Sequence, residues 1–300
     1  MRPLWGIDLG GTKIEGVVLA ERSADSVLVR TRIATEAAGG YDHILQQIER
    51  LVDRLAAEVG MRPDHLGIGT PGALDPTTEL LKNSNTTCLN GRALKRDLEA
   101  RLRIPLRLAN DANCFAVAET TLGAVHQQLP GARVVFGVIM GTGVGGGLVI
   151  DGRAWNGRHG IGGEWGHIFL DESGGPCYCG KTGCAERIIS GPALERYYHD
   201  QTGRSMRLKN ILRAHEAGTD PAATATVERL LDNFAKGISY ILNVIDPDAV
   251  VLGGGLANID LLYTEGVRRI GAHLFNPRLA TPFLRPALGD SAGVFGAALL

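Results

Sequence analysis

The chain opens with an apolar run, a short glycine turn and a second apolar run. Residues 4–19 read LWGIDLGGTKIEGVVL, in which hydrophobic, strand-favouring residues flank Gly-Gly-Thr. Such a pattern predicts a β-hairpin. Residues 132–152 repeat it as ARVVFGVIM, the turn GTGVGG and the run GLVIDG. One hairpin in each half of the chain indicates an internal duplication.

Helical and strand-like patterns alternate over the rest of the chain. Apolar residues recur at helical spacing from Ile44 to Val59 and stop at Gly60, which predicts a helix. Residues 155–190 are rich in glycine and cysteine and predict an irregular segment. Further strands are expected at 26–34, 65–68, 106–109 and 249–257, and further helices at 92–102, 110–119, 193–199 and 227–245, with two more helices near the C-terminus.

Composition narrows the functional classes. The 300 residues are enough for two domains, and 44% hydrophobic and 21% charged residues are typical of a globular protein. Basic and acidic residues number 31 and 32, so nothing favours nucleic acid or a membrane surface as a partner. There is no signal-peptide pattern and no membrane-length apolar run, so we expect a cytoplasmic protein. The 41 glycines indicate places where backbone approaches another group closely.

The turn GTGVGG at 141–146 also fits the dinucleotide fingerprint G-x-G-x-x-G. That fingerprint requires a helix directly after the turn, whereas the next residues are strand-like. A turn whose backbone N–H groups point at phosphate explains four glycines better than a tight hairpin turn alone. The run LGGGLA at 252–257 is a weaker signal: it suits a flat adenosine lying against backbone, but such turns are also common packing devices.

The first turn, DLGGTK, adds side-chain chemistry. Asp8 ends the strand and is suited to hold Mg²⁺ through water. Gly10 and Gly11 offer backbone amides, and Thr12 and Lys13 offer a hydroxyl and a cation. The alternative interpretation is a solvated hairpin loop.

Acid–base candidates follow the strand at 106–109 and the second hairpin. Asp111 is interpreted equally well as a base that accepts a proton from a hydroxyl and as a helix N-cap. Asn110 beside it offers an amide for a sugar hydroxyl. Glu164 and His167, in the run GEWGH, suit a polyhydroxylated ligand. Glu186 is more easily explained as a solvated charge.

Residues 174–184 read GGPCYCGKTGC and match two incompatible patterns. The P-loop pattern G-x-x-x-x-G-K-[ST] needs a strand before it and a helix after it, and neither is predicted, while Pro176 removes a backbone donor. Three cysteines with His167 have the composition of a Cys₃His zinc site. The segment has few apolar side chains to order it, and metal ligation stabilises such loops strongly. We therefore predict a structural zinc here.

Taken together, these motifs resemble the ROK family of bacterial sugar kinases. The runs are DLGGTK, GTPG, NDANCFA, GTGVGGGLVIDG, GEWGH and C-x-C-G-x-x-G-C-x-E, and they cover essentially the whole chain. The resemblance implies an α/β, actin-like (ribonuclease H-like), duplicated two-domain ATPase fold with an interdomain cleft that closes on substrate. It implies a small domain of residues 1–118 plus 289–300 and a large domain of residues 119–288 that carries the zinc loop.

The family's site residues fall into three sets on this sequence. The resemblance implies sugar contacts from Asn85, Asn110, Asp111, Glu164, His167 and Glu186, with Asp111 as catalytic base. It implies ATP and Mg²⁺ contacts from Asp8, Gly10, Gly11, Thr12, Lys13, Gly141, Thr142, Gly143, Gly254 and Gly255. It implies zinc ligation by His167, Cys177, Cys179 and Cys184, so that one nitrogen of His167 binds metal and the other binds sugar.

The resemblance also bears on substrate and partners. KNSNTTCLNG and PCYCGKTGC look most like the fructokinase/mannokinase branch, although Cys88 replaces an expected aromatic residue. We therefore expect phosphorylation of the 6-hydroxyl of a hexose, fructose first and mannose or glucose next, with N-acetylglucosamine kinase or glucokinase as the alternative. A non-catalytic sugar sensor is a further alternative, but it needs no Asp111. The first hairpin begins too early for a DNA-reading domain before it, and a homodimer is implied.

Overall fold

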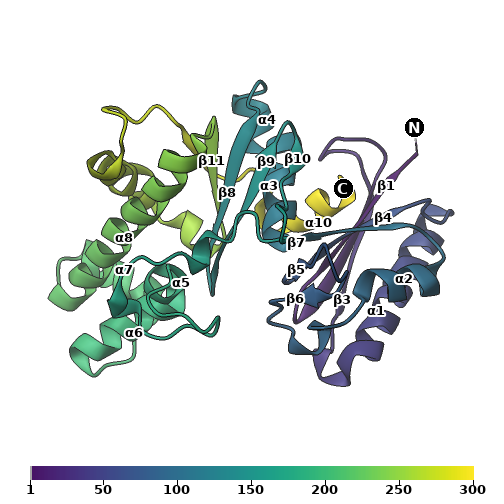
Figure 1. Cartoon of the computed structure of the whole chain (residues 1–300), viewed down its shortest axis with the longest axis horizontal. Helices are drawn as coiled ribbons and strands as arrows, with labels where there is room; N and C mark the ends of the chain where they lie inside the picture. Colours follow the sequence, from purple (N-terminus) through teal and green to yellow (C-terminus); the bar gives the residue numbers. More distant parts are fainter. Residues whose placement is uncertain (1) are drawn as a thin grey trace. The chain divides into compact units, whose positions relative to one another are not determined.

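The computed structural model describes residues 2–300, which form two compact units (Figure 1). Unit 1 consists of Met1–Gly137, Gly147–Gly163 and Pro286–Leu300, and unit 2 consists of Val138–Gly146 and Glu164–Arg285. The domain division expected from the sequence differs from these units, since residues 119–137 and 147–163 pack within unit 1. That division stays a prediction.

Unit 1 is built on a five-stranded sheet with the order β3-β2-β1-β4-β7. The apolar–glycine–apolar pattern at the N-terminus forms the predicted hairpin, in which β1 and β2 pair antiparallel. The two later strands lie parallel to β1 on its other side. In chain order the strands are β1 (Leu4–Leu9), β2 (Lys13–Leu19), β3 (Val27–Ala34), β4 (Leu66–Thr70) and β7 (Leu106–Asn110).

Helices cover both faces of this sheet. Gly6 and Gly67 are register partners, and a methyl group on either would collide with the backbone of α10 (Ala292–Ala298). Gly16 pairs with Ile7, one position along from Gly6, and a methyl group there would meet leucines of α1 (Gly40–Val59). Because successive residues of a strand point to opposite faces, α10 and α1 lie on opposite faces of the sheet. Asp8 shares the α10 face with Gly6.

Shorter elements complete unit 1. The predicted helices are present as α2 and α3, and α3 packs closely on α10. A two-stranded ribbon, β5 with β6, follows β4. The bounds are β5 (Ala73–Leu74), β6 (Leu81–Lys82), α2 (Leu94–Leu102), α3 (Asp111–Thr121) and α4 (Ala124–Gln128).

Unit 2 contains most of the second sheet, whose order is β10-β9-β8-β11-β12. The second predicted hairpin forms β8 and β9, and each of these strands lies partly in unit 1 and partly in unit 2. The long helix α8 packs against α5, α6, α7 and α9. The bounds are β8 (Val134–Met140), β9 (Val144–Ile150), β10 (Arg153–Ala154), α5 (Glu186–Ile189), α6 (Gly191–Thr202), α7 (Leu208–Glu216), α8 (Pro221–Ile245), β11 (Ala249–Gly253), α9 (Val267–Ile270) and β12 (Phe283–Leu284).

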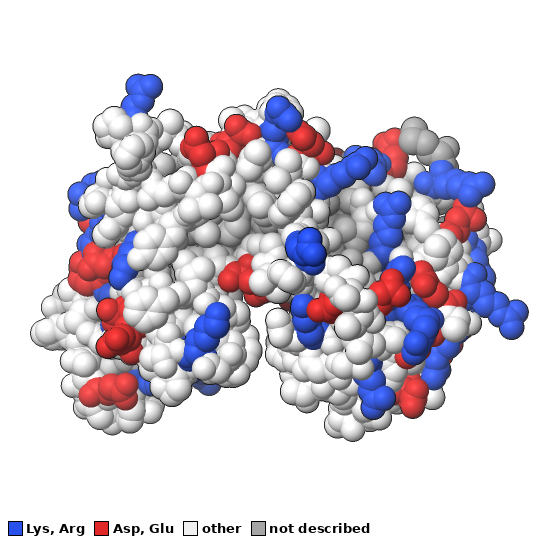
Figure 2. All heavy atoms as spheres, in the orientation of Figure 1, with Lys and Arg blue, Asp and Glu red and all other residues white. Residues whose placement is uncertain are grey.

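Most sequence-predicted elements are confirmed, and two helices outside residues 155–190 were not expected. Residues 155–190 are largely irregular, as predicted, with short helical turns and the four-residue helix α5, and β10 lies directly before them. The unexpected helices are α4 and α7, whose residues were assigned no structure. Among residues 2–300, no helix combines the length and apolar character needed to cross a bilayer. On the face drawn in Figure 2, basic and acidic side chains are interspersed over much of the surface.

Candidate functional site

Asp8 ends strand β1 at a closely packed point of unit 1. A methyl group on Gly69, its register partner, would lie 3.5 Å from the Asp8 carboxylate, and one on Gly293 would lie 3.1 Å from it. Burial, with a smaller contribution from the nearby charge of Asp111, raises the pKa of Asp8 to about 6. The carboxylate is thus half-buried, confined by glycines and electrostatically linked to Asp111.

Helix α3 begins at Asp111, directly after the residue that caps it. The N-cap is Asn110, whose side-chain oxygen accepts from the N–H of Ala112 at 2.9 Å. Asp111 is the first helical residue, and its Oδ1 also accepts from Ala112 at 2.8 Å. The side chain is accessible to solvent, yet desolvation by surrounding protein raises its pKa, partly offset by that N–H. Asp111 therefore presents a reachable carboxylate with raised proton affinity.

Asn110 is joined to the loop that carries Asn85. The Asn110 amide donates to the carbonyl of Gly72 at 3.2 Å. Gly72 has a φ of 91°, and a methyl group there would lie 2.8 Å from the nitrogen of Ser84. Asn90 holds Ser84 through hydrogen bonds of 2.8 and 2.9 Å, and Asn85 next to it is exposed. The predicted sugar contacts Asn85 and Asn110 thus belong to one connected part of unit 1.

The first glycine turn is held firmly while its side chains stay exposed. The N–H of Gly10 donates to the carbonyl of Lys13 at 3.0 Å, and the Thr35 hydroxyl donates to the carbonyl of Gly10 at 2.6 Å. A methyl group on Gly11 would lie 3.3 Å from the Thr86 hydroxyl. Thr12 and Lys13 are exposed. A fixed backbone with free side chains is a suitable arrangement for phosphate contacts.

In unit 2, the second glycine turn packs against two other predicted residues. A methyl group on Gly141 would lie 3.7 Å from the nitrogen of Gly255. Gly254 has a φ of 77°, and a methyl group there would lie 2.3 Å from the Met140 carbonyl. Thr142 is exposed at the tip of the turn. The nucleotide residues expected at 141–143 and 254–255 are therefore neighbours.

Glu186 is anchored to the same turn rather than being a solvated charge. Its Oε2 accepts from the N–H of Val144 at 3.0 Å. A methyl group on Gly143 would lie 2.7 Å from that oxygen, so a larger residue there would displace the carboxylate. The run GEWGH packs here too, since the Trp165 indole donates to the carbonyl of Gly145 at 2.7 Å. Glycines in GTGVGG thus allow close packing against the sugar-site candidates.

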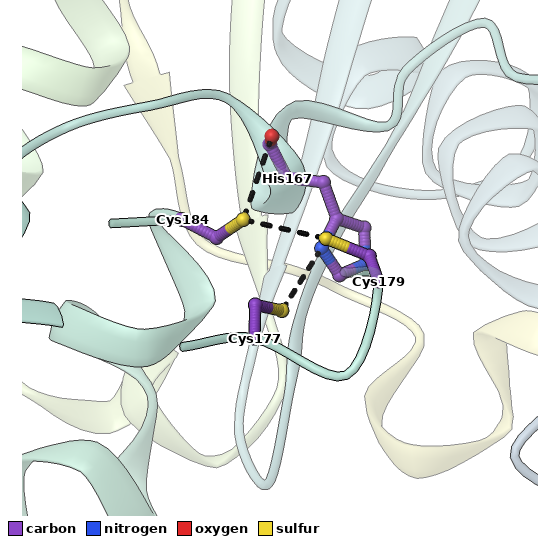
Figure 3. A group of neighbouring side chains, drawn as sticks. All are labelled: His167, Cys177, Cys179 and Cys184. Carbon is purple, nitrogen blue, oxygen red and sulfur yellow. Dashed lines mark hydrogen bonds between the residues drawn. The ribbon is translucent and has the colours of Figure 1, made fainter. Parts of the chain in front are cut away.

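The four predicted zinc ligands converge, as Figure 3 shows. Their ligand atoms all lie within 4.8 Å of one another. Cys179 Sγ lies 3.6 Å from Cys184 Sγ, and Cys177 Sγ lies 3.7 Å from His167 Nδ1. Tetrahedral zinc, with Zn–S bonds of about 2.3 Å, separates its ligand atoms by about 3.5–3.8 Å. The spacing fits such an ion.

The surrounding loop has no P-loop architecture. Residues Pro176 and Thr182 form an isolated antiparallel bridge, and the N–H of Cys177 donates to the carbonyl of Lys181 at 2.7 Å. The segment is therefore a tight loop with no strand entering it. Lys181 and Thr182 are exposed.

Sequence reasoning missed Tyr178, which contacts the second ring nitrogen of His167. The phenol oxygen lies 3.0 Å from His167 Nε2, and the rings meet edge to face. Packing around the phenol oxygen raises the pKa of Tyr178 to about 12 although most of the side chain is exposed, and the charge of Glu186 is a smaller cause of this rise. A tyrosine between two cysteines carries no sequence signal for this contact, which depends on how the loop folds back.

The predicted site residues thus form two sets, each within one unit. Unit 1 holds Asp8, Gly10, Gly11, Thr12, Lys13, Asn85, Asn110 and Asp111. Unit 2 holds Gly141, Thr142, Gly143, Glu164, His167, Cys177, Cys179, Cys184, Glu186, Gly254 and Gly255.

Comparisons with known proteins cover nearly the entire chain. Residues 4–300 match the family model described as ROK family. The N-acetyl-D-glucosamine kinase of Pectobacterium carotovorum subsp. carotovorum is 38% identical over 308 residues, or 99% of this chain and 98% of that relative. The ROK hexokinase from Thermus thermophilus has a TM-score of 0.88 at 33% identity, covering 99% and 97% of the two chains. A ROK family glucokinase from Streptomyces griseus, in complex with glucose and AMPPNP, has a TM-score of 0.78 at 29% identity, covering 99% and 98%.

Proposed function

The chain belongs to the ROK family and is an ATP-dependent sugar kinase, and we propose that it phosphorylates the 6-hydroxyl of N-acetyl-D-glucosamine. The observation that carries this substrate is the full-length similarity to an N-acetyl-D-glucosamine kinase at 38% identity. This identity exceeds the 33% and 29% shared with the hexokinase and the glucokinase.

The fructose preference expected from the sequence receives no support from these relatives. They favour the alternative that accompanied it, N-acetylglucosamine. Glucose is the second candidate. The glucokinase of 29% identity has glucose bound in its structure, and this protein matches that chain over 98% of its length.

In the proposed reaction Asp111 is the general base. It accepts the proton of the sugar hydroxyl while that oxygen forms a bond to the γ-phosphorus of ATP, and the bond to the β–γ bridging oxygen breaks to release ADP. An accessible carboxylate with raised proton affinity, at the first position of α3 and with Asn110 as the N-cap, supports this role. Sugar hydroxyls are held by Asn85 and Asn110 of unit 1 and by Glu164, His167 and Glu186 of unit 2.

The nucleotide is held mainly by backbone and metal. Asp8 positions Mg²⁺ through water, and the glycine turns offer N–H groups to the phosphates. The proposed contacts are Gly10, Gly11, Thr12 and Lys13 in unit 1, and Gly141, Thr142, Gly143, Gly254 and Gly255 in unit 2.

His167, Cys177, Cys179 and Cys184 would hold a structural zinc. Two of their ligand-atom separations, 3.6 and 3.7 Å, are those of a tetrahedral ion, and four protein ligands would leave no open position. Its role is to fix the loop that carries His167 next to Glu186.

An ADP-release assay across N-acetylglucosamine, glucose, mannose and fructose tests the substrate. We expect the highest kcat/KM for N-acetylglucosamine. A higher value for fructose or glucose overturns the substrate proposal and leaves the kinase activity standing. Phosphorylation at an undiminished rate by Asp111→Asn overturns the assignment of the base.

A further inference from the structure

Tyr178 lies between two zinc-ligand cysteines and is an exposed aromatic side chain. Its exposed fraction is 76%, so burial of the ring contributes little to holding it in place. Two contacts do hold it: the phenol oxygen lies 3.0 Å from His167 Nε2, and the two rings stand at 90° with their centroids 5.2 Å apart. The loop positions the side chain, because Cys177 and Cys179 on either side of it both belong to the group of four predicted zinc ligands.

The direction of this hydrogen bond follows from the ligand geometry. His167 Nδ1 points at Cys177 Sγ, 3.7 Å away, and is the nitrogen that would take the metal. A metal-bound nitrogen carries no proton, so the N–H of the neutral imidazole is at Nε2. Nε2 therefore donates, and the phenol oxygen of Tyr178 accepts.

Nε2 is also the atom through which His167 is proposed to bind the sugar. One N–H makes one good hydrogen bond at a time, so a sugar hydroxyl and the Tyr178 phenol compete for it. Glu164 and Glu186, the other proposed sugar contacts of unit 2, both act electrostatically on Tyr178, so the phenol belongs to the same electrostatic surroundings as these groups.

We propose that Tyr178 is a specificity-determining residue whose phenol oxygen occupies the sugar-hydroxyl position on His167 until the sugar displaces it. This inference rests on the proposed function, in which His167 binds a sugar hydroxyl. The exposed ring can swing out at little cost, since few packing contacts are lost. Each sugar then has to replace the hydrogen bond that the phenol gives up, so sugars without a hydroxyl at that position bind least well.

The test compares the wild type with Tyr178→Phe, which keeps the ring and removes the competing oxygen. A net hydrogen bond of this kind corresponds to about a two- to tenfold change in affinity. We expect KM for the preferred sugar to fall by that factor with kcat nearly unchanged. Sugar binding by calorimetry, with a non-hydrolysable ATP analogue present, should show the same fall in Kd. Tyr197→Phe is the matched control, since it removes a hydroxyl from the same unit outside this contact.

Deoxy sugars identify the displacing hydroxyl. For the analogue that lacks it, the ratio of wild-type Kd to Tyr178→Phe Kd should return to one. Bound zinc, measured in both proteins, should be equal, which separates competition from loss of metal.

Three results overturn the proposal. A higher KM in Tyr178→Phe means that the phenol contacts the sugar directly, and an unchanged KM means that no competition occurs. A ratio that stays the same for every deoxy sugar removes the role of the hydroxyl. A wild type that binds none of the sugars contradicts the proposed function instead, which keeps the two failures apart.

Discussion

Replacing Glu119 with glutamine tests how helix α3 is tied to the C-terminal segment of unit 1. Glu119 is fully buried on α3, eight residues after Asp111. Its carboxylate accepts from three backbone N–H groups, those of Ala124 at 2.8 Å, Ala287 at 3.0 Å and Leu288 at 2.9 Å. Because this carboxylate is buried, water cannot take its place as the acceptor for the three N–H groups.

The cost of Glu119→Gln follows from this geometry. If the amide oxygen takes the place of Oε1, it keeps Ala287 and Leu288, which both donate to that oxygen. The amide NH₂ then faces the N–H of Ala124, so that donor meets donor. Losing one charge-assisted bond costs about 1.5–3 kcal/mol, and the stranded N–H costs a further ~1–3 kcal/mol. We expect a loss of about 3–5 kcal/mol in local stability.

Native-state hydrogen exchange is the appropriate measurement, because a chain of two units need not unfold in one step. The amides of Ala124, Ala287 and Leu288 should exchange roughly two to four orders of magnitude faster in Glu119→Gln. Glu58→Gln is the control: its exposed carboxylate meets only Arg54, at 3.5 Å, and such surface pairs contribute about 0–1 kcal/mol. Unchanged protection at all three amides would refute the anchoring role of Glu119.

Three other predictions concern the catalytic and metal residues. Asp111→Asn should lower kcat by about 10²–10⁴-fold with an unchanged circular dichroism spectrum, the range expected for loss of a general base, and a loss under tenfold would contradict it. The pKa of Asp8 is raised to about 6 and that of Asp111 is raised as well, so both carboxylates become protonated at a higher pH than an ordinary aspartate. The rate measured as kcat/KM should therefore decline below pH of about 6, and a profile flat to far lower pH would count against this. Removing the metal with a chelator, or substituting Cys184→Ser, should abolish stoichiometric zinc in elemental analysis. Either change should also make the loop of residues 176–185 sensitive to protease. A wild-type protein that never contains zinc would contradict the site.

The sequence predicts the two hairpins well because their signal is local. In DLGGTK and GTGVGG the apolar runs and the turn residues that pair them are adjacent in the chain. Helix α7 is harder to predict, since it is short and polar on average and is stabilised by packing of the buried Ile211 against α6 and α8. Local pattern therefore gives strands and long helices, while short helices depend on packing.

Side-chain roles divide in the same way. The cysteine spacing indicates a metal site without any structure, because ligand type and number carry the chemistry. Both Asn and Asp suit a helix cap, so the sequence does not say whether Asn110 or Asp111 caps α3. In the structure Asn110 is the cap, because its own backbone is extended while its side chain accepts from the N–H of Ala112. The bonds from Val144 to Glu186 and between His167 and Tyr178 join atoms from loops whose paths no pattern specifies.

Helix α3 is where the catalytic candidate and the paths of the chain between the units meet. The chain passes between the units at four points, and α3 contacts the chain near three of them, which lie after Gly137, at Gly147 and at Pro286. A methyl group on Gly137 would lie 2.7 Å from the side chain of Ala116, and one on Gly147 would lie 2.5 Å from the carbonyl of Ala112, both on α3.

The third passage is held to the same helix by Glu119, through Ala287 and Leu288. Glycine is required at the first two passages because any larger residue would push the chain off α3. The helix whose first residue is Asp111 is therefore in contact with the chain close to each of these three passages. These contacts tie the element that positions the proposed base to the segments next to those passages.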